Sequence, residues 1–146
     1  MKTLIAYAMQ FIGVPYKWGG STHDGIDCSG LVHELMLSIG MVPPEGDRTA
    51  QSLYEFFSKG LAQPTNNPTA GALVFYGQSL KAISHVAFMI DQTRMIEAGG
   101  GGHLTITRAD AERDLAFVRI RPYTRRKDLL VMLMPNYPTW MGPSGS

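Results

Sequence analysis

The sequence predicts a single α+β domain in which helices come first and strands follow. Apolar residues recur at helical spacing over residues 2–59, and strand-length apolar runs replace that pattern from residue 72 onward. The chain has 146 residues, of which 45% are apolar and 17% charged, which suits one globular domain with its own core. Its 16 glycines and 9 prolines favour a turn-rich mixed fold over a helical bundle.

Three helices are expected in the first part of the chain. The first covers residues 2–12, where apolar residues fall on one helical face. The second, residues 28–39, is the most apolar, and Gly40 follows it where a C-terminal cap belongs. A shorter third helix is expected over residues 49–59, followed by a loop at residues 64–69.

Short strands are expected after the helices. The last of them alternates apolar residues with arginine, as a half-exposed strand does. Residues 91–94 are expected to form the hairpin turn between the second strand and the third. The predicted strands are residues 72–76, 85–90, 95–96, 104–107 and 117–120.

The character of the chain changes near its end. We therefore assign residues 1–123 to the main domain and residues 124–146 to a C-terminal extension, with disorder expected over residues 142–146. The basic cluster at residues 125–127 is interpreted as solvated surface. Residues 129–134 form an apolar run that predicts either an added strand or a contact surface for a protein or particle partner.

Composition excludes several classes of protein. The formal net charge of +1 argues against a dedicated nucleic-acid binder and against a protein held to membranes by a basic surface. No apolar run is long enough for a transmembrane helix. The apolar stretch at residues 3–5 is also too short for the core of a signal peptide, so no export signal is expected. With Cys28 as the single cysteine, an intramolecular disulfide and a cysteine-rich zinc site are both excluded.

Cys28 occupies a position that suits a reactive thiol. It lies at the predicted first turn of the most apolar helix. Unpaired backbone N–H groups and the helix dipole favour an anion there, so a thiolate would be stabilised. The alternative is a buried cysteine that only fills the core, and position alone does not separate the two.

A thiolate nucleophile needs an imidazole within reach, and the chain offers four histidines. His33 points about 140° away from Cys28 around the same helix, and His23 lies in a polar loop. His85 opens a strand, where a base is held rigidly beside a cleft, and it is the candidate. The spacing of Cys28, His23, His85 and His103 fits no compact pair of metal ligands, so neither a metal nor a cofactor is expected.

Four segments of the chain match the motifs of a known family in order and spacing. They are Pro-Tyr-Lys-Trp-Gly-Gly (residues 15–20), Asp-Cys-Ser-Gly (27–30), Gly-Ala-Leu-Val-Phe (71–75) and Ser-His-Val-Ala-Phe (84–88). Together they resemble the NlpC family (NlpC/p-sixty) of cell-wall cysteine peptidases, across residues 2–121. The resemblance implies a papain-like fold, with helices packed on a small antiparallel sheet. It also implies hydrolysis of peptide bonds in peptidoglycan stem peptides, commonly next to γ-D-glutamate.

The resemblance assigns a role to each matching residue. Cys28 would be the nucleophile, and His85 the general base and acid. The Tyr16 hydroxyl and the backbone N–H of Cys28 would stabilise the oxyanion. Asp27 and Ser29 match positions that recognise the free amine end of the stem peptide. The plainer alternatives are a packed aromatic for Tyr16 and a helix N-cap for Asp27, and the N-cap can coexist with recognition.

The third catalytic residue is where the sequence departs from the family pattern. The family usually places a polar residue, most often histidine, twelve positions after the base, and here that position holds Glu97. A carboxylate suits the task because it accepts the imidazole N–H and stabilises the imidazolium. The rival is His103. Direct opposition of His85 to Glu97 centres the hairpin turn on Asp91, and opposition to His103 centres it on Arg94, so geometry leaves both open and only the family spacing favours Glu97.

The expected function is a cysteine peptidase that cuts peptidoglycan stem peptides, acting on the cell wall. One alternative is a particle-associated protein such as a phage tail component, in which the domain is structural or opens the wall locally. Residues 129–134 would then supply the partner surface. A second alternative is a related thiol amidase or acyltransferase, because the same cysteine–histidine pair serves any acyl transfer.

Overall fold

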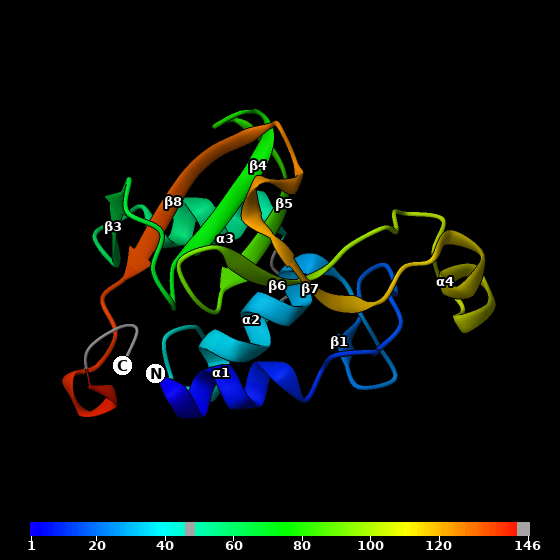
Figure 1. Cartoon of the computed structure of the whole chain (residues 1–146), viewed down its shortest axis with the longest axis horizontal. Helices are drawn as coiled ribbons and strands as arrows, with labels where there is room; N and C mark the ends of the chain where they lie inside the picture. Colours follow the sequence, from blue (N-terminus) through cyan, green and yellow to red (C-terminus); the bar gives the residue numbers. More distant parts are fainter. Residues whose placement is uncertain (46–48, 143–146) are drawn as a thin grey trace.

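The computed structural model describes residues 1–45 and 49–142. Helices cover one face of an antiparallel sheet, which confirms the α+β prediction, and α4 projects at one end of the molecule (Figure 1). The two ends of the described chain meet, because the Met1 amino group donates a hydrogen bond to the Met141 carbonyl at 2.9 Å. The disorder expected over residues 142–146 falls, apart from Gly142, outside the described residues.

The three predicted helices are present with shifted ends. They are α1 (Lys2–Met9), α2 (Cys28–Ser38) and α3 (Ala50–Phe57). Helix α1 stops short of residue 12, and hydrogen-bonded turns continue from there to a glycine with a positive φ. Across residues 1–45 and 49–142, no helix is both long and apolar enough to cross a membrane.

The main sheet has six strands in the order β3-β8-β4-β5-β6-β7, and every neighbouring pair is antiparallel. A separate two-stranded ribbon, β1 (Ser21–Thr22) with β2 (Gly25–Ile26), precedes α2. The strands of the main sheet are β3 (Ala62–Thr65), β4 (Leu73–Ser79), β5 (Ala82–Met89), β6 (Arg94–Ala98), β7 (Val118–Pro122) and β8 (Leu129–Pro135).

Both faces of the sheet are packed, which agrees with strands that are apolar on both sides. The larger cluster joins the helices to the sheet and includes Leu31 and Leu35 of α2 with Val86 and Phe88 of β5. A smaller cluster is formed by Ala72, Val74, Tyr76, Ala87, Met89, Met95 and Met132. Burying both sets of side chains fixes the strand register, because a one-residue slip would exchange the two faces.

Two sequence expectations fail for identifiable reasons. The strand expected at residues 104–107 is irregular chain that leads into α4 (Arg108–Asp114), because Thr107 and Asp110 form a capping box that starts this helix. Helix α4 has no apolar periodicity that would predict it, because it is short and buries only Ala111. Part of the loop expected at residues 64–69 belongs to β3, whose edge position tolerates a proline without an N–H to donate.

The apolar run at residues 129–134 forms a strand, which is the first of the two alternatives predicted from the sequence. It forms β8, which pairs with β4 on one side and with β3 on the other. The β8 strand therefore lies inside the sheet, and its polar backbone groups are engaged along both edges.

Close packing of two glycines joins the loop before α2 to the first turn of that helix. A methyl group at Gly30 would overlap the carbonyl oxygen of Gly20. The same carbonyl accepts a hydrogen bond from the Asp27 N–H at 3.1 Å. A side chain at Gly30 would force the loop away from the end of the helix.

We expect Gly30→Ala to lower the free energy of unfolding by about 1–3 kcal/mol, the usual cost of overpacking a fixed contact. Urea unfolding measures this change. Gly102→Ala is the matched control, because a methyl group there meets no atom and the residue has no positive φ. The control should stay within about 0.5 kcal/mol of the wild type, and equal losses from both variants would contradict the packing interpretation.

Candidate active site

The nucleophile candidate, Cys28, is the first residue of α2, and its thiol is free and half-buried. Asp27 is the N-cap of this helix, since its Oδ1 accepts the Gly30 N–H at 2.7 Å. The uncapped N–H groups of the first turn and the helix dipole create positive potential at this point. The local structure therefore presents a thiol where negative charge is favoured.

A cleft of about 980 Å³ opens in front of Cys28. Its walls come from α2, from the loop at residues 16–21, from the start of β5 and from residues 101–103. The lining includes Tyr16, Trp18, Asp27, Cys28, Ser29, His33, Ser84 and His103. The cleft therefore gathers most of the predicted site residues and is large enough for a small peptide.

His85 lies on β5, and 5% of its surface is exposed. Its Nε2 is 2.7 Å from Oε1 of Glu97, and its ring is close enough to Cys28 for the two groups to interact electrostatically. Because Nε2 is occupied by Glu97, Nδ1 is the nitrogen available to the thiol. The structure thus brings the predicted nucleophile and base together.

Glu97, on β6, is the residue that reaches His85. The pairing of Phe88 with Ile96 centres the hairpin between β5 and β6 on residue 92, between the two centres that the sequence left open. Glu97 therefore sits diagonally across from His85, within reach of a long side chain. His103 instead lies exposed at the rim of the cleft, edge-on to Trp18 with ring centroids 6.2 Å apart.

Burial and charge act in opposite directions on this pair. Burial disfavours the imidazolium of His85, but its hydrogen bonds with Cys28 and Glu97 and their charges outweigh that effect and raise the pKa of His85 to about 9. Burial also disfavours the Glu97 carboxylate, whereas bonds from His85 and Arg125 hold its pKa down, to about 2. The arrangement therefore favours an ionised His85–Glu97 pair.

Arg125 lies at the surface, as the sequence predicts for residues 125–127, and it also contributes to this site. Its Nη2 and Nε donate to the two carboxylate oxygens of Glu97 at 3.0 and 3.2 Å. Its neighbour Arg126 is also engaged, with both oxygens of Asp128. No local sequence signal identifies this pair, and the need for it follows from the structure, because a carboxylate buried as deeply as Glu97 requires more than one partner.

Tyr16 is buried, and its ring packs so closely on Gly101 that a methyl group there would overlap it. Burial, then the charges of Cys28 and Asp27, raise the pKa of the Tyr16 hydroxyl. The hydroxyl therefore keeps its proton and can donate a hydrogen bond within the cleft.

Asp27 and Ser29 line the same cleft but also serve the backbone. Besides capping α2, Asp27 accepts the Gly19 N–H on Oδ2 at 2.8 Å. The Ser29 hydroxyl donates to the other oxygen at 3.3 Å. The N-cap alternative for Asp27 is therefore correct, and the carboxylate fixes the loop that forms one wall of the cleft.

The remaining histidines are engaged elsewhere. His33 Nε2 lies 3.1 Å from the Pro43 carbonyl, and His23 stacks on Phe11 with centroids 4.2 Å apart. In the described part of the chain, no group of three or more His, Cys, Asp or Glu side chains is arranged to hold a metal ion.

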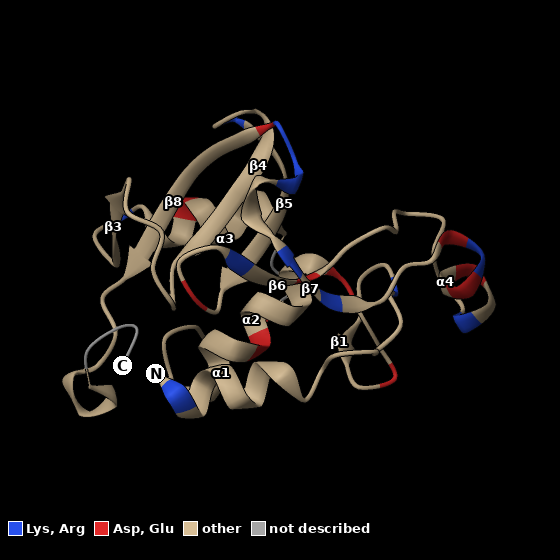
Figure 2. Cartoon of the chain, viewed as in Figure 1, with Lys and Arg blue, Asp and Glu red and all other residues tan. Residues whose placement is uncertain are grey.

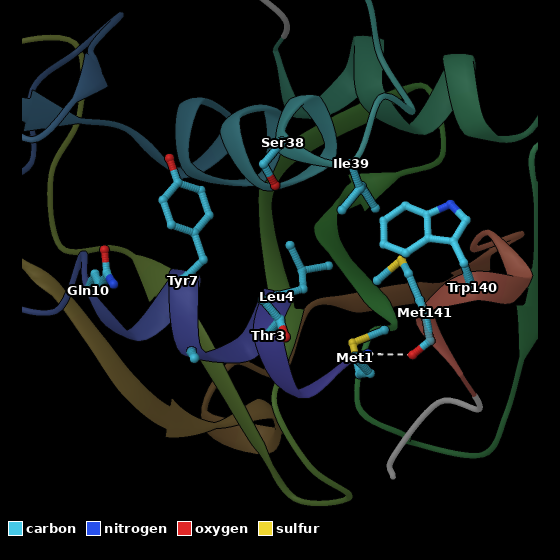
Figure 3. A pocket seen from close by; sticks show the side chains of 10 residues that line it. Met1, Thr3, Leu4, Tyr7, Gln10, Ser38, Ile39, Trp140 and Met141 are labelled. Carbon is cyan, nitrogen blue, oxygen red and sulfur yellow. Dashed lines mark hydrogen bonds between the residues drawn. The ribbon is translucent and has the colours of Figure 1, made fainter.

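A second cavity, of about 630 Å³, lies between α1, the end of α2 and the C-terminal turn η2 (Thr139–Met141). Its wall is largely apolar and includes Leu4, Ile39 and Trp140 (Figure 3). It contains no cysteine or histidine and shares no residue with the cleft at Cys28. The cleft at Cys28 is therefore the candidate active site.

Comparison with known proteins shows which family and which fold the chain resembles. A sequence profile described as the NlpC/P60 family matches residues 13–115. Over 104 residues the chain is 36% identical to the bifunctional muramidase/DL-endopeptidase CwlT of Bacillus subtilis. That match covers 69% of this chain but only 30% of CwlT, so the chain spans less than a third of that relative.

Solved structures share the fold. The peptidoglycan hydrolase RipB of Mycobacterium tuberculosis superposes with a TM-score of 0.67 at 24% identity, covering 94% of this chain and 64% of RipB. RipD of the same organism, described as a non-catalytic NlpC/p60 domain protein adapted to peptidoglycan binding, gives a TM-score of 0.65 at 21% identity, over 92% of this chain and 95% of RipD. The predicted papain-like fold is therefore confirmed.

We expect NMR titration of the His85 ring to give a midpoint near pH 9 in the wild type. Glu97→Gln should lower that midpoint, because a neutral amide stabilises the imidazolium less than a carboxylate does. His103→Ala should leave it unchanged, since that ring lies against Trp18. A midpoint that moves with His103→Ala and not with Glu97→Gln would show that the wrong partner was assigned to His85.

Proposed function

The chain belongs to the NlpC/P60 family, whose relatives include peptidoglycan endopeptidases, and we propose that it is itself a cysteine endopeptidase acting on peptidoglycan stem peptides. One observation carries the proposal. A free thiol at a helix N-terminus lies close enough to a buried histidine to interact with it electrostatically, and that histidine is bound to a buried carboxylate. This is the arrangement that an acyl-transfer enzyme with a thiol nucleophile requires.

In the acylation step, the Cys28 thiolate attacks the carbonyl carbon of the scissile peptide bond. The carbonyl electrons move to oxygen, and the Cys28 N–H and the Tyr16 hydroxyl donate to the oxyanion. The carbon–nitrogen bond then breaks, and the His85 imidazolium gives its proton to the departing amine. The products of this step are a free amine and a thioester on Cys28.

In the deacylation step, neutral His85 takes a proton from a water molecule that attacks the thioester carbonyl. The carbon–sulfur bond breaks, the product leaves as a carboxylic acid that then loses its proton to solvent, and the thiolate–imidazolium pair is restored. Glu97 accepts the N–H of His85 throughout. It keeps the ring orientation constant, and its charge stabilises the imidazolium each time that it forms.

We propose that the acyl side of the substrate ends in a free amine next to γ-D-glutamate. Asp27 and Ser29 line the cleft beside Cys28, and an anionic carboxylate there suits an ammonium group. The naming of CwlT as a DL-endopeptidase supports a mixed-chirality peptide as the substrate class.

The competing function is binding without cleavage, since RipD is described as a non-catalytic protein with the same fold. In this chain the placement of Cys28 beside His85, with His85 bound to Glu97, favours catalysis over binding alone. A thiol amidase or acyltransferase would use the same three residues, so the products have to identify the reaction.

We expect purified stem peptides to be cleaved by the wild type and left intact by Cys28→Ala, with mass spectrometry identifying the products. Peptides with a free N-terminal amine should be cleaved faster than acetylated ones, because Asp27 would lose its cationic partner. Cys28→Ala also serves as the binding control. If no stem peptide gives a Cys28-dependent product while both proteins bind peptidoglycan, the chain is a binding module.

We expect Glu97→Gln to lower kcat by about tenfold to a hundredfold, as loss of a group that orients a catalytic residue commonly does. The reason is weaker support of the imidazolium, so KM should change little. His103→Ala, at the exposed rim, should keep kcat within a factor of about three. Steady-state kinetics on one stem peptide measures both variants, and a larger loss of kcat from His103→Ala would reverse the assignment of the third residue.

A further inference from the structure

We propose that Arg125 is a positioning residue for catalysis, which holds the Glu97 carboxylate in the orientation and ionised state that His85 requires. This inference rests on the proposed cysteine-endopeptidase function. The interaction is geometric: Glu97 Oε1 lies between His85 Nε2 at 2.7 Å and Arg125 Nη2 at 3.0 Å. Arg125 Nε binds the second oxygen at 3.2 Å. Two bonds from one planar guanidinium fix the plane of the carboxylate, which a single bond does not.

Charge balance gives Arg125 a second task. A thiolate, an imidazolium and a carboxylate together carry one net negative charge, and both His85 and Glu97 are nearly fully buried. An uncompensated charge in such a place is strongly unfavourable. The guanidinium of Arg125 makes the series neutral, with charges that alternate in sign from Cys28 outward. Arg125 thereby favours the ionised form of the whole site.

Other charged groups surround Glu97 but do not replace this contact. Arg119 directly opposes Glu97 across β6 and β7, yet its Nη2 donates to the Leu115 carbonyl at 2.6 Å. Arg121 lies two residues further along β7. Arg126 is paired with Asp128. Figure 2 shows these basic residues along β7 and the connection to β8. Within the described chain, Arg125 is the arginine that donates hydrogen bonds to Glu97.

The segment that carries Arg125 is anchored to the sheet. Arg125 ends a short 3-10 turn, η1 (Tyr123–Arg125), and the Tyr76 hydroxyl donates to the Tyr123 carbonyl at 2.6 Å. The Arg126 guanidinium lies 5.3 Å from the centre of the Tyr76 ring. Strand β8 begins a few residues later and is paired on both sides. The backbone on each side of Arg125 is therefore held in place by contacts other than the one between the Arg125 side chain and Glu97.

Arg125 also lies outside residues 13–115, the part of the chain that the NlpC/P60 profile matches. Glu97, which departs from the usual family residue, lies inside the matched range, whereas its partner Arg125 lies outside it. The η1–β8 segment contributes to the active site as well as to the sheet.

The test compares Arg125→Gln and Arg125→Lys with Lys127→Gln. Lys127 is an exposed cation two residues away, so its replacement changes the net charge equally without touching Glu97. For each protein we would measure kcat and KM on one stem peptide across pH. The rate of Cys28 alkylation by iodoacetamide across the same pH range is a readout that needs no substrate.

Arg125→Gln should lower kcat by about tenfold to a hundredfold, with KM little changed. The acid limb of both pH profiles should move about one unit upward, because Glu97 loses a cation that favours its ionised form and the thiolate loses charge balance. Arg125→Lys should be intermediate, since it restores the charge but not the two-point contact. Lys127→Gln should behave as the wild type.

The double variant Glu97→Gln/Arg125→Gln tests whether Arg125 acts through Glu97. If it does, the double variant should lose no more than about twofold beyond Glu97→Gln alone. A full, additional loss in that background would overturn the proposal, as would an Arg125→Gln variant with unshifted pH profiles. A purely structural role would lower the amount of folded protein and leave both profiles in place.

The outcome for Arg125 is separable from the outcome for the proposed function. If the wild type cleaves no stem peptide, the endopeptidase proposal fails, and the alkylation profiles still decide whether Arg125 supports the ionised site. If Arg125→Gln does not fold, the same measurements are made on Arg125→Lys. An unshifted alkylation profile in the lysine variant, together with wild-type kcat, would then overturn the positioning role.

Discussion

The buried hydrogen bond between His85 and Glu97 is the interaction on which the site depends. An imidazole with 5% of its surface exposed would resist protonation, because water cannot solvate the cation. The carboxylate at 2.7 Å, together with Cys28, reverses that preference. It can do so only because β5 and β6 pair in a register that places the two side chains diagonally across the hairpin. That register in turn is held by apolar side chains on both faces of the sheet, so core packing and site chemistry are set by the same strand alignment.

The second constraint lies at the start of α2. Asp27 caps the helix, fixes the Gly19 loop and stands beside Cys28, so one carboxylate links local folding to the shape of the cleft. Gly30 allows the loop to approach closely enough for these bonds to form. A single short turn therefore positions the thiol, creates the positive potential around it and shapes the wall of the cleft that faces the substrate. The buried His85–Glu97 pair approaches this turn from the sheet, and the reacting atoms lie where the two meet.

The elements and residues that could be predicted from the sequence are those marked by local patterns. Helical periodicity located α2 and placed Cys28 at its start, where a thiolate is favoured, and the place of His85 on a predicted strand made it the candidate base. Features that depend on contacts between residues far apart in the sequence could not be predicted. The hairpin register between Asp91 and Arg94 follows from the packing of both sheet faces, and the link from Arg125 to Glu97 depends on how β7 continues into η1. Helix α4 buries too little to show periodicity, and the proline of β3 is tolerated only because that strand lies at the edge.

The position of β8 has a consequence for the order of folding. Ala62 of β3 pairs with Pro135 of β8, so β3 has no partner in the sheet until β8 has been synthesised. Pairings between such distant residues require closure of a long loop and are slow to form. During synthesis, the hairpin of β4 and β5 can form early, whereas the sheet is completed only after the C-terminal segment has left the ribosome. Completion of the sheet is thus tied to the emergence of residues 129–135.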